Sequence, residues 1–401
     1  MSLLDQILRE STWEAFYEYK LSLACPKQFT KALRKFIDEK RYIGLYDKFV
    51  NRKEFSLPVR SVISKLGSDK KRIVYTYPED ESTVYKLITH LMLRKYDHLF
   101  ERGLYSFRPG KTAKDAVRGL LGTADLSKMY AYKADIHDYF NSVPVDEMNE
   151  VLKNVLSDDN ELYEMLSGLL AEPDVVYRGR VIREKKGIMA GTPQSAFYAN
   201  IFLTEMDRRF SEKGVIYARY SDDIILFAPA EEEVKEHAEY IRDHLARHSL
   251  EINPSKEDFY SPGDGFTFLG FMCKGNVVDI APVTLTKLIK KMHRKRDALV
   301  RWRKRNDVKP EKAACAFIRV FNRKLLESPR DNELSWSNWF FPVINTTESL
   351  HAIDQCAQDC LRYIISGKHT KGRFNVRYED LKALGYRSLV NAYYSYRKKA
   401  P

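Results

Sequence analysis

The sequence predicts an α+β fold in which an antiparallel sheet of the split β-α-β type precedes a long helical region. Three observations lead to this prediction. Two β-like runs flank the segment Tyr220-Ser221-Asp222-Asp223, as the strands of a hairpin do, and a further apolar strand is predicted over residues 130–136. Helical patterns lie between these strands, which gives the order β-α-β-β-α-β. From residue 284 onward the chain is predicted to be mostly helical.

Before the hairpin, helical and strand-like segments alternate. Apolar side chains recur at helical spacing near the N-terminus and again over 83–100, whereas residues 61–77 show short β-like runs around a turn. The predicted elements here are helices over 1–50, strands within 61–77, a helix over 83–100, a helix from about Thr112, the strand over 130–136, a helix from about Asp146, and a long helix over 192–210.

After the hairpin, a charged amphipathic helix is predicted over 231–249, followed by a strand pair over 266–271 and 277–280. Two more helices are expected near the C-terminus, one from about Tyr378 and one after Gly385.

Composition bounds the class of protein. With 401 residues the chain can bury a large core and is predicted to hold two or three domains. Hydrophobic residues make up 44% of it, which excludes a disordered protein. No apolar run reaches the length of a membrane span, and the first residues lack a signal-peptide pattern.

The five cysteines are an odd number and are scattered, which favours a reducing, cytoplasmic setting over a disulfide framework. Cys356 and Cys360 lie one helical turn apart. Because this is not a known zinc spacing, we interpret them as core cysteines.

The positive charge is concentrated in one segment. The formal net charge is +12, and residues 281–330 hold 16 Lys and Arg against 4 Asp and Glu, which is also a difference of +12. Basic side chains recur there at helical spacing, which predicts either a solvated face or a helix that lies along a nucleic-acid backbone. We interpret Trp302 in this segment as a core residue rather than one that stacks on a base. The basic side chains predicted to contact nucleic acid are Lys287, Lys291, Arg294 and Lys295.

Two adjacent aspartates, Asp222 and Asp223, occupy the predicted hairpin turn. Like charges side by side indicate a bound cation, and a pair of divalent ions fits best. Asp135 ends the apolar strand over 130–136 and would project beside that turn if the two strands are neighbours. Three carboxylates are ligands that Mg²⁺ prefers, and two such ions promote phosphoryl transfer. The alternative is that Asp135 caps the following helix.

A glycine-containing loop over 187–195 precedes the helix predicted from Thr192. Glycine permits close approach of a ligand, and the amide of Gln194 can bind a sugar or a base edge. The alternative is an ordinary helix start, with Thr192 as the cap and Pro193 in the first turn.

Several basic residues are candidates for phosphate contacts. Lys65, Lys71 and Arg72 flank a predicted turn that would close over a triphosphate, although basic turns are often merely solvated. Arg108 and Lys256 are equally ambiguous in isolation, and Lys256 is a candidate general acid toward pyrophosphate.

Taken together, these segments resemble the reverse transcriptases, specifically the bacterial branch similar to group II intron and retron enzymes. The resemblance covers about residues 50–280. The matching segments are Asp135 for motif A, residues 191–203 for motif B, Tyr220-Ser221-Asp222-Asp223 for motif C, Lys256 for motif D, residues 106–110 for the family's Y-x-F-R-P-G element, and residues 268–270 for the primer grip.

The resemblance implies roles for individual residues. It implies that Asp135, Asp222 and Asp223 are catalytic and bind metal together with Ile136. Phe140 resembles the family's steric gate, which would exclude a ribose 2′-hydroxyl. Ser221 stands where alanine is commoner in this branch. The implied nucleotide contacts are Lys65, Lys71, Arg72, Phe140, Gln194 and Lys256, and the implied nucleic-acid contacts include Arg108.

The implied fold is a right-hand polymerase. Its expected parts are an N-terminal helical extension (1–50), fingers and palm (51–280), a basic helical thumb (281–345) and a C-terminal helical region (346–401). Two roles stay open for the last region: contact with RNA, or packing on the thumb alone. The implied cofactors are two Mg²⁺ ions, for which Mn²⁺ can substitute. The implied partners are dNTPs, an RNA template with a DNA or RNA primer, and a structured noncoding RNA.

We find no His/Cys-rich nuclease segment after the thumb, which favours a compact polymerase similar to the defence-associated (antiphage) reverse transcriptases. Three alternatives stay open: a retron-type enzyme, a maturase-like RNA-binding protein with an idle polymerase site, and an untemplated or protein-primed polymerase. No membrane partner is expected, and a homo-oligomer is left open.

Overall fold

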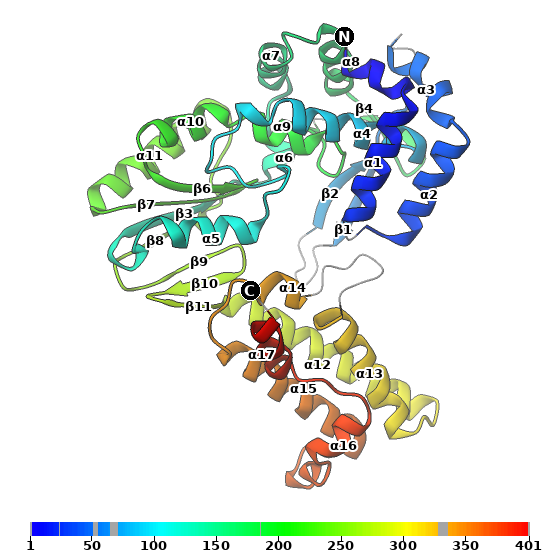
Figure 1. The fold of residues 1–401 in the computed structure, drawn as a ribbon, viewed down its shortest axis with the longest axis vertical. Coiled ribbons are helices and arrows are strands. Elements are labelled where there is room, and N and C mark those ends of the chain that lie inside the picture. Colours follow the sequence, from blue (N-terminus) through cyan, green and yellow to red (C-terminus); the bar gives the residue numbers. More distant parts are fainter. Residues whose placement is uncertain are drawn as a thin grey trace. The chain divides into compact units, whose positions relative to one another are not determined.

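The computed structural model describes residues 2–23, 25–50, 55–64, 71–184, 186–327 and 336–399. The chain divides into two compact units, Met1–Pro262 and Gly263–Pro401, and each is described by itself (Figure 1).

A four-stranded antiparallel sheet carries the candidate site in the first unit. Its strand order is β6-β7-β3-β8, and the strands are β3 (Tyr130–Asp135), β6 (Ile216–Tyr220), β7 (Asp223–Ala228) and β8 (Asp258–Tyr260). Helix α11 (Glu231–Arg247) packs on β3 and β7. This is the predicted split β-α-β arrangement. The fourth strand is β8 and not the predicted 266–271. The sequence did not reveal β8, because this strand has only three residues and carries no apolar alternation.

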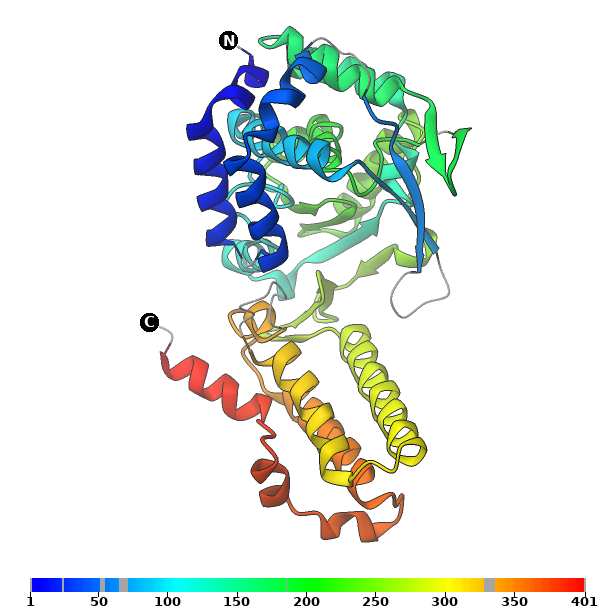
Figure 2. The same ribbon diagram turned by 90° about the vertical axis from the view of Figure 1, so that its right-hand side faces the viewer.

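The predicted N-terminal helices are present and pack into the first unit. They are η1 (Leu3–Leu8), α1 (Glu10–Ser22), α2 (Lys27–Asp38) and α3 (Arg41–Val50), and α1 and α2 lie side by side (Figure 2). Trp13 is fully buried, and its ring stacks on Tyr42 at a centroid distance of 5.3 Å. Asp159, far along the chain, accepts a hydrogen bond of 2.7 Å from the backbone N–H of Leu3. These contacts join the extension to the core of this unit.

A second sheet of the first unit has the order β2-β1-β4-β5. Its strands are β1 (Val59–Ser64), β2 (Lys71–Thr76), β4 (Asp174–Tyr177) and β5 (Arg180–Arg183); β1 and β4 are parallel and the other pairs antiparallel. Helix α4 (Glu79–Lys95) follows and begins earlier than the predicted residue 83. Its first turn carries three acidic residues after Pro78, an arrangement that the helix dipole favours. The smaller elements are η2 (Asp97–Leu99), α5 (Ala113–Thr123), η3 (Leu126–Lys128), α6 (Tyr139–Ser142), α7 (Val145–Val155), α8 (Asn160–Ala171) and η4 (Pro254–Lys256).

The long helix predicted over 192–210 is interrupted. It consists of α9 (Ser195–Ile201) and α10 (Thr204–Glu212), and its first residue follows Gln194, while the Thr192 hydroxyl donates to the carbonyl of Met189. The break coincides with contacts from strand β6. The Arg219 guanidinium donates to the carbonyl oxygens of Ala199 and Asn200, which a continuous helix would use for its own backbone.

The second unit combines a three-stranded sheet with helices. The sheet has the order β11-β10-β9, formed by β9 (Phe266–Phe268), β10 (Phe271–Lys274) and β11 (Val277–Ile280). The predicted strand over 266–271 is therefore two strands. They are joined at Leu269-Gly270, where both residues have positive φ, as a tight hairpin turn requires.

Three long helices lie side by side in this unit: α12 (Pro282–Arg305), α13 (Pro310–Leu325) and α15 (Glu348–Ser366) (Figure 2). The shorter helices are α14 (Trp336–Phe340), η5 (Lys371–Asn375), α16 (Tyr378–Ala383) and α17 (Leu389–Lys399), so both predicted C-terminal helices are present. Trp302 is 36% exposed, which contradicts its interpretation as a core residue.

The unit boundary lies before β9, whereas we had placed the end of the palm after β11. The reason is that β11 is bonded to the helical part: the backbone N–H of Val278 donates to Asn345 at 2.8 Å, and Asp279 accepts from the Ser349 hydroxyl at 2.8 Å.

Among the described residues, no helix combines the length and the apolar character that a bilayer span requires. All five cysteines are free thiols.

Candidate active site

The three predicted catalytic aspartates lie at one edge of the β6-β7-β3-β8 sheet. Asp135 is the last residue of β3 and lies opposite Asp223, the first residue of β7, in the antiparallel register. Asp222 precedes it in the turn, and its carbonyl oxygen accepts a hydrogen bond of 3.0 Å from the N–H of Ile136. Residues paired across antiparallel strands have Cα atoms about 4.5–5.5 Å apart. Strand register thus brings together carboxylates that are far apart in the sequence.

Ile136 lies beside the same turn. The N–H of Ile136 donates to the carbonyl oxygen of Asp222, which places the backbone of residue 136 beside the acidic turn. A backbone oxygen at this position fits its predicted place among the metal ligands.

The turn between β6 and β7 is tight and strained. Tyr220 pairs with Asp223, so Ser221 and Asp222 alone form the connection. Ser221 is buried and has a φ of 61°, a left-handed conformation that side chains other than those of Gly, Asn and Asp rarely adopt. The small serine side chain is compatible with this tight turn.

Burial and like charge act together on the two turn carboxylates. Burial raises the pKa of Asp222, and the nearby charge of Asp135 raises it further, while Lys256 and Arg72 oppose this shift. Burial, followed by the charges of Asp222 and Asp135, raises the pKa of Asp223 to about 6. The neighbouring cations therefore do not compensate the acidic cluster fully.

Lys256 and Asn253 hold Asp135 from the segment before β8. The Lys256 ammonium donates to one carboxylate oxygen of Asp135, and the Asn253 amide lies 3.4 Å from the other. The N–H of Asn253 also donates to the carbonyl of Asp135 at 2.8 Å. The structure thus places Lys256, a predicted nucleotide contact, directly on a predicted metal ligand.

Arg219 of β6 connects the hairpin to helix α10. We did not identify this residue from the sequence. Its side chain has 0% exposure and forms an ion pair with Asp207 of α10, with Nε–Oδ1 and Nη2–Oδ2 distances of 2.8 and 2.5 Å. The sequence did contain a signal that could have identified Arg219: it is a charged residue between two apolar strand positions, two residues before the acidic turn. Because Arg219 also bonds the α9–α10 break, it connects the acidic turn to the segment that carries Gln194.

The glycine-containing loop packs closely against two other segments. A Cβ at Gly187, whose φ is 52°, would collide with the carbonyl oxygen of Phe140, and the N–H of Ile188 donates to that oxygen at 2.8 Å. A Cβ at Gly191 would lie 3.2 Å from the carbonyl oxygen of Tyr75 in β2. The loop therefore needs its glycines to sit between β2 and the partly buried Phe140.

Gln194 is the least satisfied polar residue of this loop. It is 1% exposed, and neither its Oε1 nor its Nε2 atom has a hydrogen-bond partner. Leaving a buried amide unpaired costs free energy, so this group calls for an explanation such as strain, a catalytic role, or a bound water or ion. This observation supports the prediction that Gln194 contacts substrate.

The predicted basic contacts divide into three cases. Lys71 and Arg72 are exposed on β2, and the charge of Arg72 reaches Asp222. Lys65 lies outside the described residues. Arg108 is not available as a nucleic-acid contact, because its side chain is 7% exposed and its Nε and Nη2 atoms bond both carboxylate oxygens of Asp97 at 2.8 and 2.9 Å.

In the second unit, α12 carries the predicted basic face. Lys287, Lys291 and Arg294 are exposed, whereas Lys295 is partly buried at the flank of this face. Met292 and Leu299 are buried on the opposite side. The helix therefore presents a one-sided array of positive charge.

The acidic cluster has the donor chemistry of a divalent-cation site, although Asp135, Asp222 and Asp223 are not a group whose ligand atoms all lie within 4.8 Å of one another. Its carboxylate and carbonyl oxygens are hard donors of the type that Mg²⁺ and Mn²⁺ prefer. Burial first, and then the charges of Asp222 and Asp135, raise the pKa of Asp223. A bound ion would reverse this shift, because the pKa of a carboxyl group falls beside a metal.

Comparison with known proteins agrees with these observations. Residues 63–273, more than half of the chain, match the family model described as reverse transcriptase (RNA-dependent DNA polymerase). No curated protein matches the chain. Among solved structures, a C-terminally truncated telomerase from Candida tropicalis is 14% identical, with a TM-score of 0.46, over 57% of this chain and 55% of its own length. The telomerase from Candida albicans, in complex with a TWJ fragment of telomeric RNA, is 10% identical, with a TM-score of 0.46, over 89% of this chain and 71% of its own.

The chain thus spans about half the length of the first of these telomerase structures. The family match includes β3, β6, β7 and β8, which carry or border the acidic cluster. This chain belongs to the reverse transcriptase (RNA-dependent DNA polymerase) family.

Proposed function

We propose that this chain is an RNA-directed DNA polymerase that makes cDNA by metal-dependent nucleotidyl transfer. The observation that carries the proposal is the register of β3 and β7, which sets Asp135 opposite Asp223 with Asp222 in the adjoining turn. Two Mg²⁺ ions held by these carboxylates and by the Ile136 carbonyl would activate a primer 3′-hydroxyl and neutralise the triphosphate.

The other residues of the first unit have positioning roles in this proposal. The exposed Lys71 and Arg72 of β2 bind the triphosphate, with Lys65 as a further contact. Gln194 donates to and accepts from the nucleotide–template pair through its unpaired amide. Phe140 contacts the sugar and excludes a 2′-hydroxyl, which makes dNTPs the substrates.

Lys256 changes partner in the proposed reaction. In the structure its ammonium donates to Asp135. A cation bound by Asp135 would compete with Lys256 for that carboxylate, and the ammonium would then be available to donate a proton to the leaving pyrophosphate.

Template and primer binding involves α12, whose exposed Lys287, Lys291 and Arg294 would contact phosphates. We further propose that the template is a structured noncoding RNA and that the enzyme acts in antiphage defence. The resemblance to defence-associated enzymes supports this role, and the five free cysteines support a reducing, cytoplasmic compartment.

The test is primer extension by the purified chain on an RNA template with dNTPs and Mg²⁺. Wild type should yield DNA complementary to the template, and Asp222→Ala and Asp223→Ala should each abolish synthesis. Asp258→Asn on the neighbouring β8 is the matched control, because it removes an exposed carboxylate of the same sheet. Its product should equal that of wild type.

Two results would contradict the proposal. RNA binding without ion-dependent synthesis by wild type would favour the maturase-like alternative. DNA products whose sequence is independent of the template would favour untemplated synthesis. Sequencing the nucleic acids that copurify from cells tests the noncoding RNA, since its cDNA should match one RNA.

A further inference from the structure

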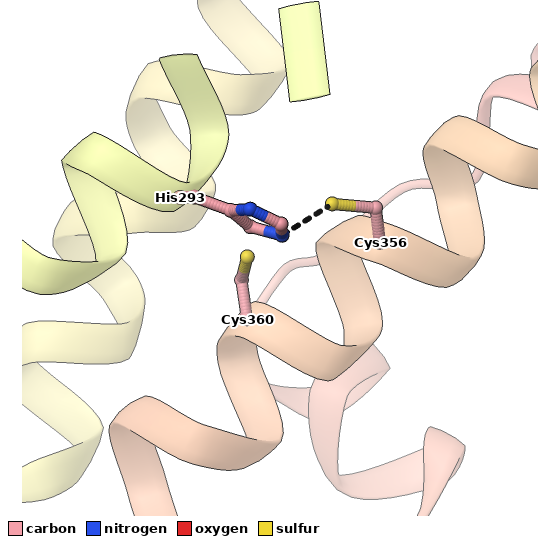
Figure 3. Close-up of side chains that lie close together, drawn as sticks. All are labelled: His293, Cys356 and Cys360. Atoms are coloured by element: carbon pink, nitrogen blue, oxygen red, sulfur yellow. Dashed lines mark hydrogen bonds between the residues drawn. The ribbon is translucent and has the colours of Figure 1, made fainter. Parts of the chain in front are cut away.

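The second unit contains a cluster of metal-ligating side chains that polymerase chemistry does not use. His293 projects from α12, and Cys356 and Cys360 project toward it from α15 (Figure 3). Their ligand atoms all lie within 4.8 Å of one another, and His293 Nε2 is 3.4 Å from Cys356 Sγ. Among the described residues, His293, Cys356 and Cys360 form the one group of three or more His, Cys, Asp or Glu side chains whose ligand atoms lie this close together.

Helix geometry explains why the three groups converge. Residues four apart lie on the same face of a helix, so both thiols of α15 point in one direction. Helix α12 packs along that face and brings His293 to it. Accessibility is graded, because Cys360 is buried, Cys356 is half-buried and His293 is exposed. An ion can therefore enter from the solvent side past the imidazole and reach the buried thiol.

The sequence alone favoured core cysteines, since the spacing of Cys356 and Cys360 matches no known zinc pattern. What the sequence did not show is the third group, which comes from a helix 63 residues away. A purely apolar role for these thiols does not require an exposed imidazole nitrogen beside the half-buried sulfur.

The donor set specifies the class of ion. Two thiolates and one imidazole suit Zn²⁺ or another thiophilic ion, whereas Mg²⁺ requires oxygen donors. With bond lengths of about 2.3 Å to sulfur and about 2.0 Å to nitrogen, a tetrahedral ion holds its sulfur ligands roughly 3.8 Å apart and its nitrogen roughly 3.6 Å from sulfur. The distance from His293 Nε2 to Cys356 Sγ is 3.4 Å, and no two of the three ligand atoms are more than 4.8 Å apart. Only small side-chain movements are therefore needed to reach the separations that a tetrahedral ion requires.

We propose that His293, Cys356 and Cys360 form a binding site for one thiophilic ion of the Zn²⁺ class, with a fourth position open to water. The ion would join α12 to α15. This link adds to the one that Arg303 already makes, because its guanidinium donates to the carbonyl of Ile364 near the end of α15 at 2.6 Å. Since α12 also carries Lys287, Lys291 and Arg294, the ion would fix the basic face relative to the rest of the unit.

The experiment uses the full chain, prepared without a polyhistidine tag and kept reduced. Titration with Co²⁺, followed by thiolate-to-cobalt charge-transfer absorption, reports sulfur ligation directly. Mass spectrometry of the metal content after Zn²⁺ loading and desalting gives the stoichiometry. We expect about one ion per chain, retained in excess Mg²⁺, since magnesium does not compete for thiolates.

Three variants test the assignment. His293→Gln, Cys356→Ser and Cys360→Ser should each weaken Co²⁺ binding by more than about tenfold, with the absorption band reduced or lost. His293 is exposed, so its substitution does not disturb the core and keeps the test valid if a cysteine variant misfolds. Cys315→Ser on α13 is the matched control, and Asp222→Ala should also retain the band, because it removes only the acidic cluster.

Two outcomes would overturn the proposal. The first is a reduced wild-type chain that retains well under one Zn²⁺ per chain and shows no thiolate band with Co²⁺. The second is unchanged Co²⁺ affinity in His293→Gln together with unchanged affinity in both cysteine variants. Either result would return Cys356 and Cys360 to the role of ordinary core thiols, and neither depends on whether the chain polymerises DNA.

Discussion

Asp223→Asn should stabilise the ion-free chain while abolishing activity. The carboxyl group has an ordinary pKa of 3.8 and a folded-state pKa of about 6, which burial raises first and the charges of Asp222 and Asp135 raise further. Each tenfold change in proton affinity corresponds to about 1.4 kcal/mol, so ionised Asp223 destabilises the folded state by up to about 3 kcal/mol. Residual contact with water reduces this to roughly 2 kcal/mol.

The pH dependence follows from the two pKa values. Below pH 3.8, Asp223 is protonated in both the folded and the unfolded chain, so the substitution changes stability little. Between pH 3.8 and about 6 the unfolded chain loses this proton first, and wild type becomes less stable relative to the variant. Above pH 6 or so the full difference persists.

The assay is thermal unfolding of wild type and Asp223→Asn in a metal chelator, across this pH range. A gain of about 2 kcal/mol raises the midpoint by roughly 4–8 °C for a unit of this size. Added Mg²⁺ should shrink the difference, since ion binding stabilises wild type alone. Asp258→Asn serves as the control and should show no such pH-dependent gain. A variant that is less stable than wild type above pH 7 without divalent ions would refute the reasoning.

Three further predictions address other parts of the molecule. Arg219→Met should lower stability by about 3–5 kcal/mol in denaturant titrations, because it leaves Asp207 as an unpaired buried charge, whereas Arg208→Met on the exposed side of α10 should be nearly neutral. A further Asp207→Leu exchange should restore part of the loss, and its failure to do so would argue against the pair. Phe140→Ala should raise ribonucleotide incorporation by more than about tenfold relative to dNTPs in single-nucleotide extension, and an unchanged ratio would exclude a gating role. Replacing the exposed basic residues of α12 by serine should lower the salt dependence of template–primer binding by about one phosphate contact for each residue removed, in filter-binding titrations with Lys235→Ser as the control. An unchanged slope would remove α12 from the interface. The α12 residues concerned are Lys287, Lys291 and Arg294.

The acidic cluster could be predicted because its parts obey short-range rules. The strands around the two aspartates and the strand that ends in Asp135 are visible as short apolar runs, and the split β-α-β order makes those strands neighbours. The interrupted helix could not be predicted in this way. Its cause is a guanidinium from another strand, and helix propensity carries no information about such a partner.

Arg108 and Cys356 show that the local sequence does not reveal a side chain's partner. For Arg108 the sequence predicted a contact that the structure excludes, and for Cys356 it missed a neighbour that the structure shows. Arg108 matched a motif for which the resemblance implied a nucleic-acid contact, yet Asp97, on a preceding turn, takes its guanidinium. Cys356 was assigned to the core because its spacing from Cys360 is uninformative, and only the packing of α12 brings His293 to its sulfur. In both cases a side chain's role depends on a partner that the local sequence does not contain.

The interruption between α9 and α10 also determines how a substitution of Arg219 would affect Gln194. If Arg219 were lost, the carbonyl oxygens of Ala199 and Asn200 would become free to accept from the amides four residues later, and one straight helix could replace the two short ones. Joining α9 and α10 into one straight helix would change the orientation of the first residues of α9, and the side chain of Gln194 would then lie in a different place. If Gln194 contacts the nucleotide–template pair as proposed, loss of Arg219 would then lower the accuracy of copying in addition to lowering stability.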